Sequence, residues 1–353
     1  MANDQPLDLT HLLDNAFGQT GTMAEIIQNA MDYQFNRVRK AVQFNGLSLE
    51  ILLNQARYGY VRSTLEKTRQ SQRIEVHPRR DPSKRSLRPH MPPPGNPVCE
   101  FCDLETSPLF ITRLTLGDKD YGLLVNRRPW GYRNFMLVTR EAEPQAMNSQ
   151  NLRNGFELIK RLGSEYEAIF TGVQAGASVY HFHLQIHRGS AAIWKNLEQK
   201  NIRVEPFFFA PGVTGSCVEG WPAHVFAFEG SDPESLADVV SCMIEIFAKG
   251  ANDFPYNIGF RYEDEVIRLL LFPRTGEEQP VCITGYPDSW GRFAFLELGG
   301  SVFLLTPEAY DAVGESQIYD AIASMSIGDS ERMKLISEFQ TFARARFLTS
   351  SEA

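Results

Sequence analysis

The stretch that decides the fold runs from Gly176 to His187 and reads GASVYHFHLQIH. Polar and apolar side chains alternate along its second half, which is the pattern of a β-strand with one buried face. One face carries the polar set, His181, His183, Gln185 and His187. Three imidazoles and an amide on one strand face indicate a function, because polar side chains cost free energy when they are buried without partners.

Three interpretations of this polar face are open: a solvated amphipathic strand, zinc ligation, and nucleophilic catalysis at phosphorus. Histidines two residues apart on a strand can ligate zinc. Alternatively, the neutral imidazole of His183 attacks an α-phosphorus and forms a phosphoramidate, from which a second acceptor takes the nucleotidyl group. The preceding turn, Gly176-Ala177-Ser178, can aim backbone N–H groups and a hydroxyl at phosphate oxygens. Strict alternation after such a turn favours the functional interpretations.

The pattern Gly-x-Ser-x-x-His-x-His-x-Gln resembles the signature of the galactose-1-phosphate uridylyltransferase branch of the histidine-triad superfamily. That branch includes diadenosine tetraphosphate phosphorylases (ATP adenylyltransferases) and nucleotide-sugar phosphorylases. The resemblance implies that His183 is the nucleophile and that Gln185 holds the phosphoryl group. Histidine-triad hydrolases have His where this chain has Gln185, so the match points to transfer or phosphorolysis. Thr171 and Ala177 depart from the residues common in relatives, Asn and Cys, which leaves the substrate open.

Other segments extend the resemblance. Leu124 to Pro129 (LVNRRP) is similar to the strand that binds base and ribose, where Asn126 takes the place of the nucleotide-binding Asn. A turn-capping role for Asn126 is the alternative, and Arg128 either contacts phosphate or is solvated. His187 is expected at the rim of the pocket, as a residue that binds the nucleotide or its phosphates. Phe254 to Phe260 and Leu271 to Arg274 resemble the C-terminal domain of ATP adenylyltransferases, and the overall layout is similar to an uncharacterised bacterial subfamily.

Cys99 and Cys102 form a C-x-x-C pair, which is half of a zinc site. In uridylyltransferases a similar pair binds structural zinc together with the first His of the catalytic motif, so the resemblance implies His181 as the third ligand. The fourth position falls near Ala142, which cannot ligate, although Glu141 and Glu143 flank it. A pair without metal and a redox pair remain alternatives, but the pair does not open a helix in a thioredoxin-like pattern.

Composition limits the class of protein. With 43% hydrophobic and 22% charged residues, the 353-residue chain resembles an ordinary globular protein. The net charge of −8 argues against nucleic-acid binding over the whole surface. No apolar run reaches the length of a membrane span, and no secretory signal is evident. Five cysteines, three of them scattered, suit a reducing cytoplasm.

The chain is expected to adopt an α+β fold of two histidine-triad-like halves, in which helices pack on antiparallel sheets. Four segments follow from the pattern: an N-terminal helical and strand segment (1–66), a basic Pro-rich loop (67–97), a catalytic unit (98–205) and an adenylyltransferase-like unit (206–350). We expect a strand at 48–61, helices over 152–166 and 315–347, and a hairpin around Gly299-Gly300.

The expected activity is nucleotidyl transfer from a nucleoside di- or polyphosphate to phosphate or a phosphorylated acceptor. A dinucleoside polyphosphate phosphorylase is the first interpretation. Nucleotide-sugar nucleotidyltransferases, adenylyl-sulfate phosphorylases and a hydrolase are alternatives, as is a nucleotide-binding protein without turnover. The resemblance also implies a possible homodimer.

Overall fold

The computed structural model describes residues 9, 39–53, 99, 101–126, 132–173, 175–177, 179–249, 255–275 and 293–347. These residues form the predicted α+β fold around a ten-stranded sheet in which all neighbouring strands are antiparallel. The order across the sheet is β3-β4-β5-β7-β6-β11-β12-β10-β9-β8. Among the described helices, none is long and apolar enough to cross a membrane.

The sheet is built from one arrangement used twice. The first half consists of β3 (Phe110–Leu116), β4 (Lys119–Val125), β5 (Tyr132–Thr139), α4 (Ser149–Leu162), β6 (Tyr166–Thr171) and β7 (His183–Arg188). The second consists of β8 (Arg203–Ala210), β9 (Val213–Glu219), β10 (Val225–Gly230), α6 (Pro233–Lys249), β11 (Tyr256–Glu263) and β12 (Val266–Pro273). In each half three strands, a helix and two strands follow one another, and the last strand inserts beside the third. The predicted boundary between residues 205 and 206 falls near the start of the second half, within β8.

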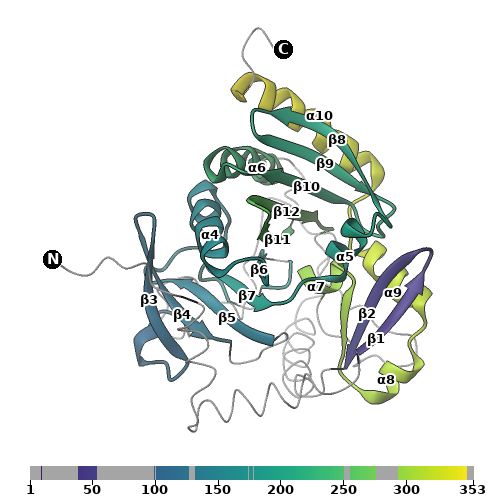
Figure 1. Cartoon of the computed structure of the whole chain (residues 1–353), viewed down its shortest axis with the longest axis horizontal. Helices are drawn as coiled ribbons and strands as arrows, with labels where there is room; N and C mark the ends of the chain where they lie inside the picture. Colours follow the sequence, from purple (N-terminus) through teal and green to yellow (C-terminus); the bar gives the residue numbers. More distant parts are fainter. Residues whose placement is uncertain are drawn as a thin grey trace, which may run out of the picture.

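β6 pairs with β11 and joins the two halves into one continuous sheet, with Ile169 opposite Gly259. Helices α4, α6 and α10 (Asp329–Phe347) cover one face (Figure 1). Their apolar sides pack on strand residues that include Phe182, Leu184 and Phe260.

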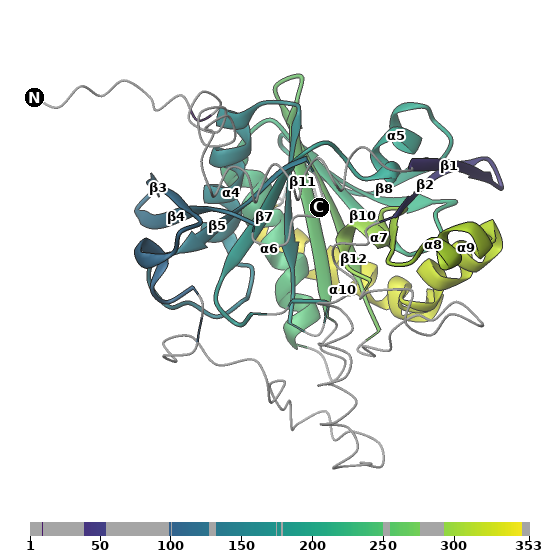
Figure 2. The same cartoon turned by 90° about the horizontal axis from the view of Figure 1, so that it is seen from below.

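Smaller elements cover part of the opposite face. They are β1 (Arg39–Phe44), β2 (Leu47–Leu53), α5 (Ala192–Glu198), α7 (Phe295–Leu298), β13 (Ser301–Leu304), α8 (Pro307–Ala312) and α9 (Glu315–Ser324). β1, β2 and β13 make a separate three-stranded sheet, and α8 and α9 lie beside it (Figure 2). A second apolar core forms here, with Phe295 packed directly on Gly259 of the large sheet.

Two expectations about these elements were wrong in detail. The segment 293–305 is not a hairpin, because α7 precedes β13 and β13 pairs in parallel with β2. Gly300, at φ 82°, allows the chain to leave α7 and turn into β13. The helix over 152–166 ends at Leu162, so that Tyr166 lies in β6. The closing segment 315–347 is helical as expected, and it consists of α9 and α10.

Other expectations were confirmed or lie outside the described residues. Asp232 caps α6, since its carboxylate accepts the Ser235 N–H at 3.0 Å. The predicted strand at 48–61 begins as β2, and its residues after Leu53 are outside the described part. The basic loop 67–97 and the predicted N-terminal helix also lie outside it.

A side chain at Gly259 should destabilise the protein, because a Cβ there would lie 1.9 Å from Cζ of Phe295. We expect Gly259→Ala to lower the free energy of unfolding by about 1–3 kcal/mol, the usual cost of overpacking a core. Urea unfolding measures the change. Gly314→Ala is the matched control, because its nearest neighbour would be 3.5 Å away. Equal stability of the two variants would contradict the prediction.

Candidate active site

β7 lies in the middle of the first half, between β5 and β6, and presents the predicted alternation. Phe182, Leu184 and Ile186 are fully buried in the core below the helices. The opposite face carries the polar set, in which Gln185 lies between Met136 of β5 and Ile169 of β6. The regular strand begins at His183, while His181 forms an isolated bridge with Pro144.

His183 is buried and held in a defined tautomer. Its Nδ1 lies 2.9 Å from the carbonyl oxygen of His181, an acceptor that requires Nδ1 to carry the proton. The lone pair is therefore on Nε2. Burial lowers the pKa of His183 to about 4, so the imidazole is neutral at pH 7. A neutral, oriented imidazole is the form that attacks phosphorus.

Gln145 fixes the backbone of His183. Its amide oxygen accepts the His183 N–H at 2.8 Å, and its amide nitrogen donates to the carbonyls of Thr171 and His183 at 2.9 and 3.2 Å. Gln145 is buried, so these bonds are shielded from water. One side chain thus joins the beginning of β7 to the end of β6, where the turn between the two strands begins.

Phe101 contacts the same imidazole from the side. Its ring lies 5.2 Å from that of His183 and 6.2 Å from that of His181, both in edge geometry. Phe101 lies between Cys99 and Cys102 in the chain. A ligand that fixes the position of the two cysteines would therefore also fix the Phe101 ring against the His183 imidazole.

The turn after β6 has the bend that a phosphate-binding loop needs. Gly176 has φ 114°, a conformation that other residues rarely adopt. Ala175 and Ala177 both donate their N–H to the Gly172 carbonyl, at 3.0 and 3.3 Å. The Ala177 amide is therefore engaged within the turn itself, and Ser178 lies outside the described residues.

Asn126 directly follows β4, where its side chain donates to the Asn134 side chain at 2.6 Å. Asn134 is buried and donates in turn to the Ile186 carbonyl of β7 at 2.9 Å. Asn126 is thus connected through Asn134 to β7, the strand that carries His183. Its role as a nucleotide ligand stays a prediction. Arg128 lies outside the described residues.

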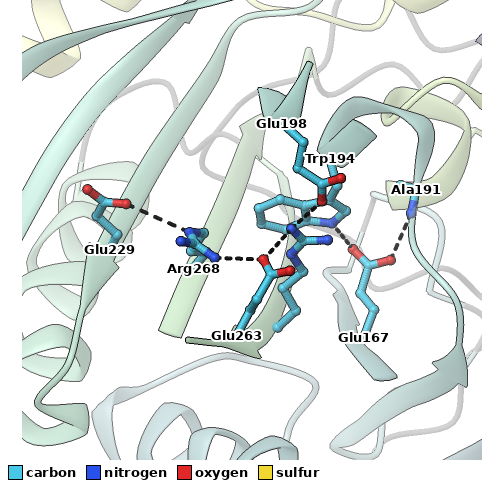
Figure 3. A network of polar contacts seen from close by, with 8 residues as sticks. Glu167, Ala191, Trp194, Glu198, Glu229, Glu263 and Arg268 are labelled. Atoms are coloured by element: carbon cyan, nitrogen blue, oxygen red, sulfur yellow. Dashed lines mark hydrogen bonds and ion pairs between the residues drawn. The ribbon is translucent and has the colours of Figure 1, made fainter. Parts of the chain in front are cut away.

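His187 faces a buried carboxylate, not an open rim. Its Nε2 lies 3.1 Å from Glu167, which is fully buried and also accepts the N–H groups of Ala191 and Trp194. Figure 3 shows how Glu167 holds these two groups at the start of α5. The contact with Glu167 holds the His187 ring against β6. The nucleotide-binding role of His187 stays a prediction.

A row of charged side chains continues from Glu167 across the sheet. Successive cross-strand neighbours are His187, Glu167, Arg261, Arg268 and Glu229. Arg261 lies 4.8 Å from the Trp194 ring and binds Glu198 and Glu263, and Glu263 also binds Arg268 at 2.7 Å (Figure 3). The row joins both halves of the sheet to α5, since Trp194 and Glu198 belong to that helix.

Cys99, Cys102 and His181 come together as predicted for a metal site. Their candidate ligand atoms lie within 4.8 Å of one another, and each sulfur is 3.6 Å from Nδ1 of His181. Nε2 of His181 lies 2.8 Å from the Thr139 carbonyl, which fixes the tautomer with a lone pair on Nδ1. Two thiols and an imidazole oriented by a backbone carbonyl suit zinc.

The described residues bring three such ligands together, and the fourth position is not filled by Glu143. Its carboxylate binds Lys119 Nζ at 2.9 Å. Burial raises the pKa of Cys99 to about 11, so that without a bound cation this side chain is a protonated thiol at pH 7. Zinc would displace this proton on binding.

Sequence reasoning missed Gln145, Phe101, Glu167 and Asn134. Phe101 is a variable position of the C-x-x-C motif and the other three belong to no motif, and each acts through a neighbour on another strand or loop. The cross-strand register that brings Glu167 opposite His187 was the signal needed to find it.

We expect the purified protein to contain about one zinc per chain, because a three-ligand protein site retains zinc with one further ligand. Elemental analysis measures the content, and Cys99→Ser together with Cys102→Ser should remove it. Cys217→Ser is the matched control, since Cys217 is a buried free cysteine outside the metal group. Zinc-free wild-type protein prepared without chelators would contradict the metal site.

Comparison with known proteins supports the resemblance. Residues 196–342 match the family described as GDPGP1-like, C-terminal domain. Yeast Ap4A phosphorylase Apa2 in complex with Ap4A is similar in structure, with a TM-score of 0.53 at 14% identity over 88% of this chain and 98% of that chain. Apa2 in complex with AMP gives a TM-score of 0.54 at 14% identity over 86% and 96%. No curated protein sequence matches this chain. The chain therefore has the fold of yeast Ap4A phosphorylase Apa2, and its residues 196–342 match the GDPGP1-like C-terminal domain.

Proposed function

We propose that this chain is a nucleotidyltransferase of the phosphorylase type, which acts through a covalent nucleotidyl-His183. The observation that carries the proposal is the state of His183: buried, neutral at pH 7, and oriented by a bond from Nδ1 to a backbone carbonyl. Gln145 and Phe101 restrict its backbone and ring. An amphipathic strand with a solvated polar face would need none of these contacts.

The reaction has two steps. The Nε2 lone pair of His183 attacks the α-phosphorus of a nucleoside di- or polyphosphate, the P–N bond forms, and the P–O bond to the leaving group breaks with its electron pair on that oxygen. Phosphate or a phosphorylated acceptor then attacks the same phosphorus, and the P–N electrons return to Nε2. Gln185 and the backbone at Gly176 would stabilise the negative charge of the transferred group, since the amides of Gly172, Ala175 and Ala177 are already hydrogen-bonded.

A dinucleoside polyphosphate is the donor that we favour. Apa2, which has the same fold over most of both chains, is an Ap4A phosphorylase solved with Ap4A and with AMP. At 14% identity the fold supports the reaction class, and the donor itself is our proposal. A nucleotide sugar and adenylyl sulfate require the same attack at an α-phosphorus, so both belong in the test.

Zinc would act as a structural ion here. Cys99, Cys102 and His181 would hold it, and the bound ion would link the cysteine loop to the start of β7. The four described cysteines are free, which agrees with the reducing cytoplasm that we propose as the location. A homodimer remains part of the proposal and requires a mass measurement in solution.

Mixing the protein with a panel of donors should produce a covalent adduct of one nucleoside monophosphate. The panel is diadenosine tetraphosphate, ADP-glucose, UDP-glucose, GDP-glucose and adenylyl sulfate, without phosphate and at mildly alkaline pH to protect the phosphoramidate. Intact-protein mass spectrometry identifies the adduct, and the donor that forms it identifies the base. Added phosphate should then remove the adduct and release a nucleoside diphosphate.

His183→Ala should form no adduct. His224→Ala is the matched control, because His224 is partly buried and interacts with Asp329, far along the chain from the motif. Nucleotide binding by the wild-type protein without any adduct would exclude the covalent mechanism and favour a binding protein without turnover.

Gln185→Ala should slow adduct formation by about 10²–10³-fold, the usual effect of removing one donor to a developing oxyanion. Rapid-quench mass spectrometry measures the rate, and equilibrium binding measures nucleotide affinity separately. We expect the affinity to change much less than the rate, because the interaction strengthens in the transition state. An unchanged rate would show that Gln185 does not hold the transferred group.

A further inference from the structure

Arg274 is a buried cation of the second half that contacts the turn of the first. It follows β12 directly and is 3% exposed. Its Nη1 donates to the carbonyl oxygens of Ala175 and Phe293, both at 2.6 Å, and Nη2 lies 3.3 Å from Sδ of Met325. The side chain therefore joins three segments that are far apart in the sequence.

The Ala175 carbonyl is held twice. Asn257 of β11 donates its Nδ2 to the same oxygen at 3.0 Å, and its own Oδ1 lies 3.4 Å from Nη1 of Arg274. Asn257 is fully buried and lies opposite Thr171, the last residue of β6. Both donors to Ala175 come from the second half and meet the turn directly after the strand junction.

The turn has a third bond to the second half, because Gly172 donates its N–H to the Tyr256 carbonyl at 3.1 Å. It also packs on the segment before α7, where a Cβ at Gly176 would lie 3.3 Å from Cβ of Ala294. Gly172, Ala175 and Gly176 of this turn are therefore all in contact with residues outside the first half.

The partners of Arg274 are unusual for a buried guanidinium. In the described part of the chain its hydrogen-bond acceptors are two carbonyls, an amide oxygen and a thioether, and none is a carboxylate. Burial lowers the pKa of Arg274 to about 10, and the charge of Glu297 offsets this only in part. A buried cation whose hydrogen bonds go to neutral groups is costly. Its charge-assisted hydrogen bonds are roughly twice as strong as bonds between neutral groups. A buried guanidinium can therefore hold a backbone conformation more firmly than a neutral side chain would.

We propose that Arg274 is a positioning residue, which sets the turn 172–177 for transfer at His183 through the carbonyl of Ala175. The effect of Arg274 on the rate of transfer rests on the proposed function. Its effect on the conformation of the turn rests on the contacts alone. The same guanidinium binds Phe293, so the docking of the segment before α7 and the conformation of the turn depend on one another.

Arg274→Lys tests the proposal while it retains the positive charge. A single ammonium at the end of a flexible chain cannot reproduce the planar fork that binds Ala175, Phe293 and Met325 together. Amide hydrogen exchange of the peptide 172–182 should become about 10-fold faster or more, while exchange of the peptide 213–230 in β9 and β10 stays unchanged.

With the donor that labels the wild-type protein, adduct formation by Arg274→Lys should slow by about 10–100-fold, because small displacements of positioning groups have effects of this size. Nucleotide affinity should change less than the rate. Asn257→Ala removes the second bond to Ala175 and should cause a smaller change in the same direction. Arg332→Lys is the matched control, since Arg332 is largely buried in the same half and binds Glu219.

Each outcome is decisive. Unchanged exchange at 172–182 in a folded Arg274→Lys protein overturns the proposal, as does faster exchange spread equally over both peptides, which indicates general destabilisation. Faster exchange at the turn with an unchanged adduct rate overturns the catalytic part. A wild-type protein that forms no adduct refutes the proposed function, and the exchange measurement then still decides whether Arg274 holds the turn.

Discussion

The antiparallel pairing of β6 with β11 is the interaction on which the rest of the structure depends. Without it, each half would end at an exposed strand edge, which proteins avoid because unpaired backbone groups invite aggregation. With it, ten strands form one sheet, and the helices of both halves share one core. The ladder between Thr171 and Asn257 also brings the turn that precedes His183 beside residues of the second half.

Close approach at this junction explains two other features. Gly259 lies opposite Ile169 in the ladder, and the absence of a side chain there allows Phe295 to lie on the sheet. On one side of this apolar contact are Asn257 and Arg274, which reach the turn, and on the other is the charged row that includes Arg261 and Glu167. The apolar contact thus separates two polar groups with different roles.

The motif predicted the fold class, the alternation on β7 and the gathering of Cys99, Cys102 and His181. These depend on spacing within short segments, which the sequence displays directly. The hairpin expected around Gly299-Gly300 was wrong, because an apolar run interrupted by glycines fits a short buried helix and strand equally well. Gln145 and Arg274 were not predicted as site residues, since their contacts cross between strands or halves.

The repeated topology has a consequence for stoichiometry. β12 occupies in the second half the place that β7 has in the first, but its sequence, VIRLLLFP, contains no histidine. Instead, β12 contributes Leu270 and Phe272 to the second apolar core. The histidine pattern of β7 thus has no counterpart in β12, so the covalent step that we propose at His183 would load one nucleotide per chain.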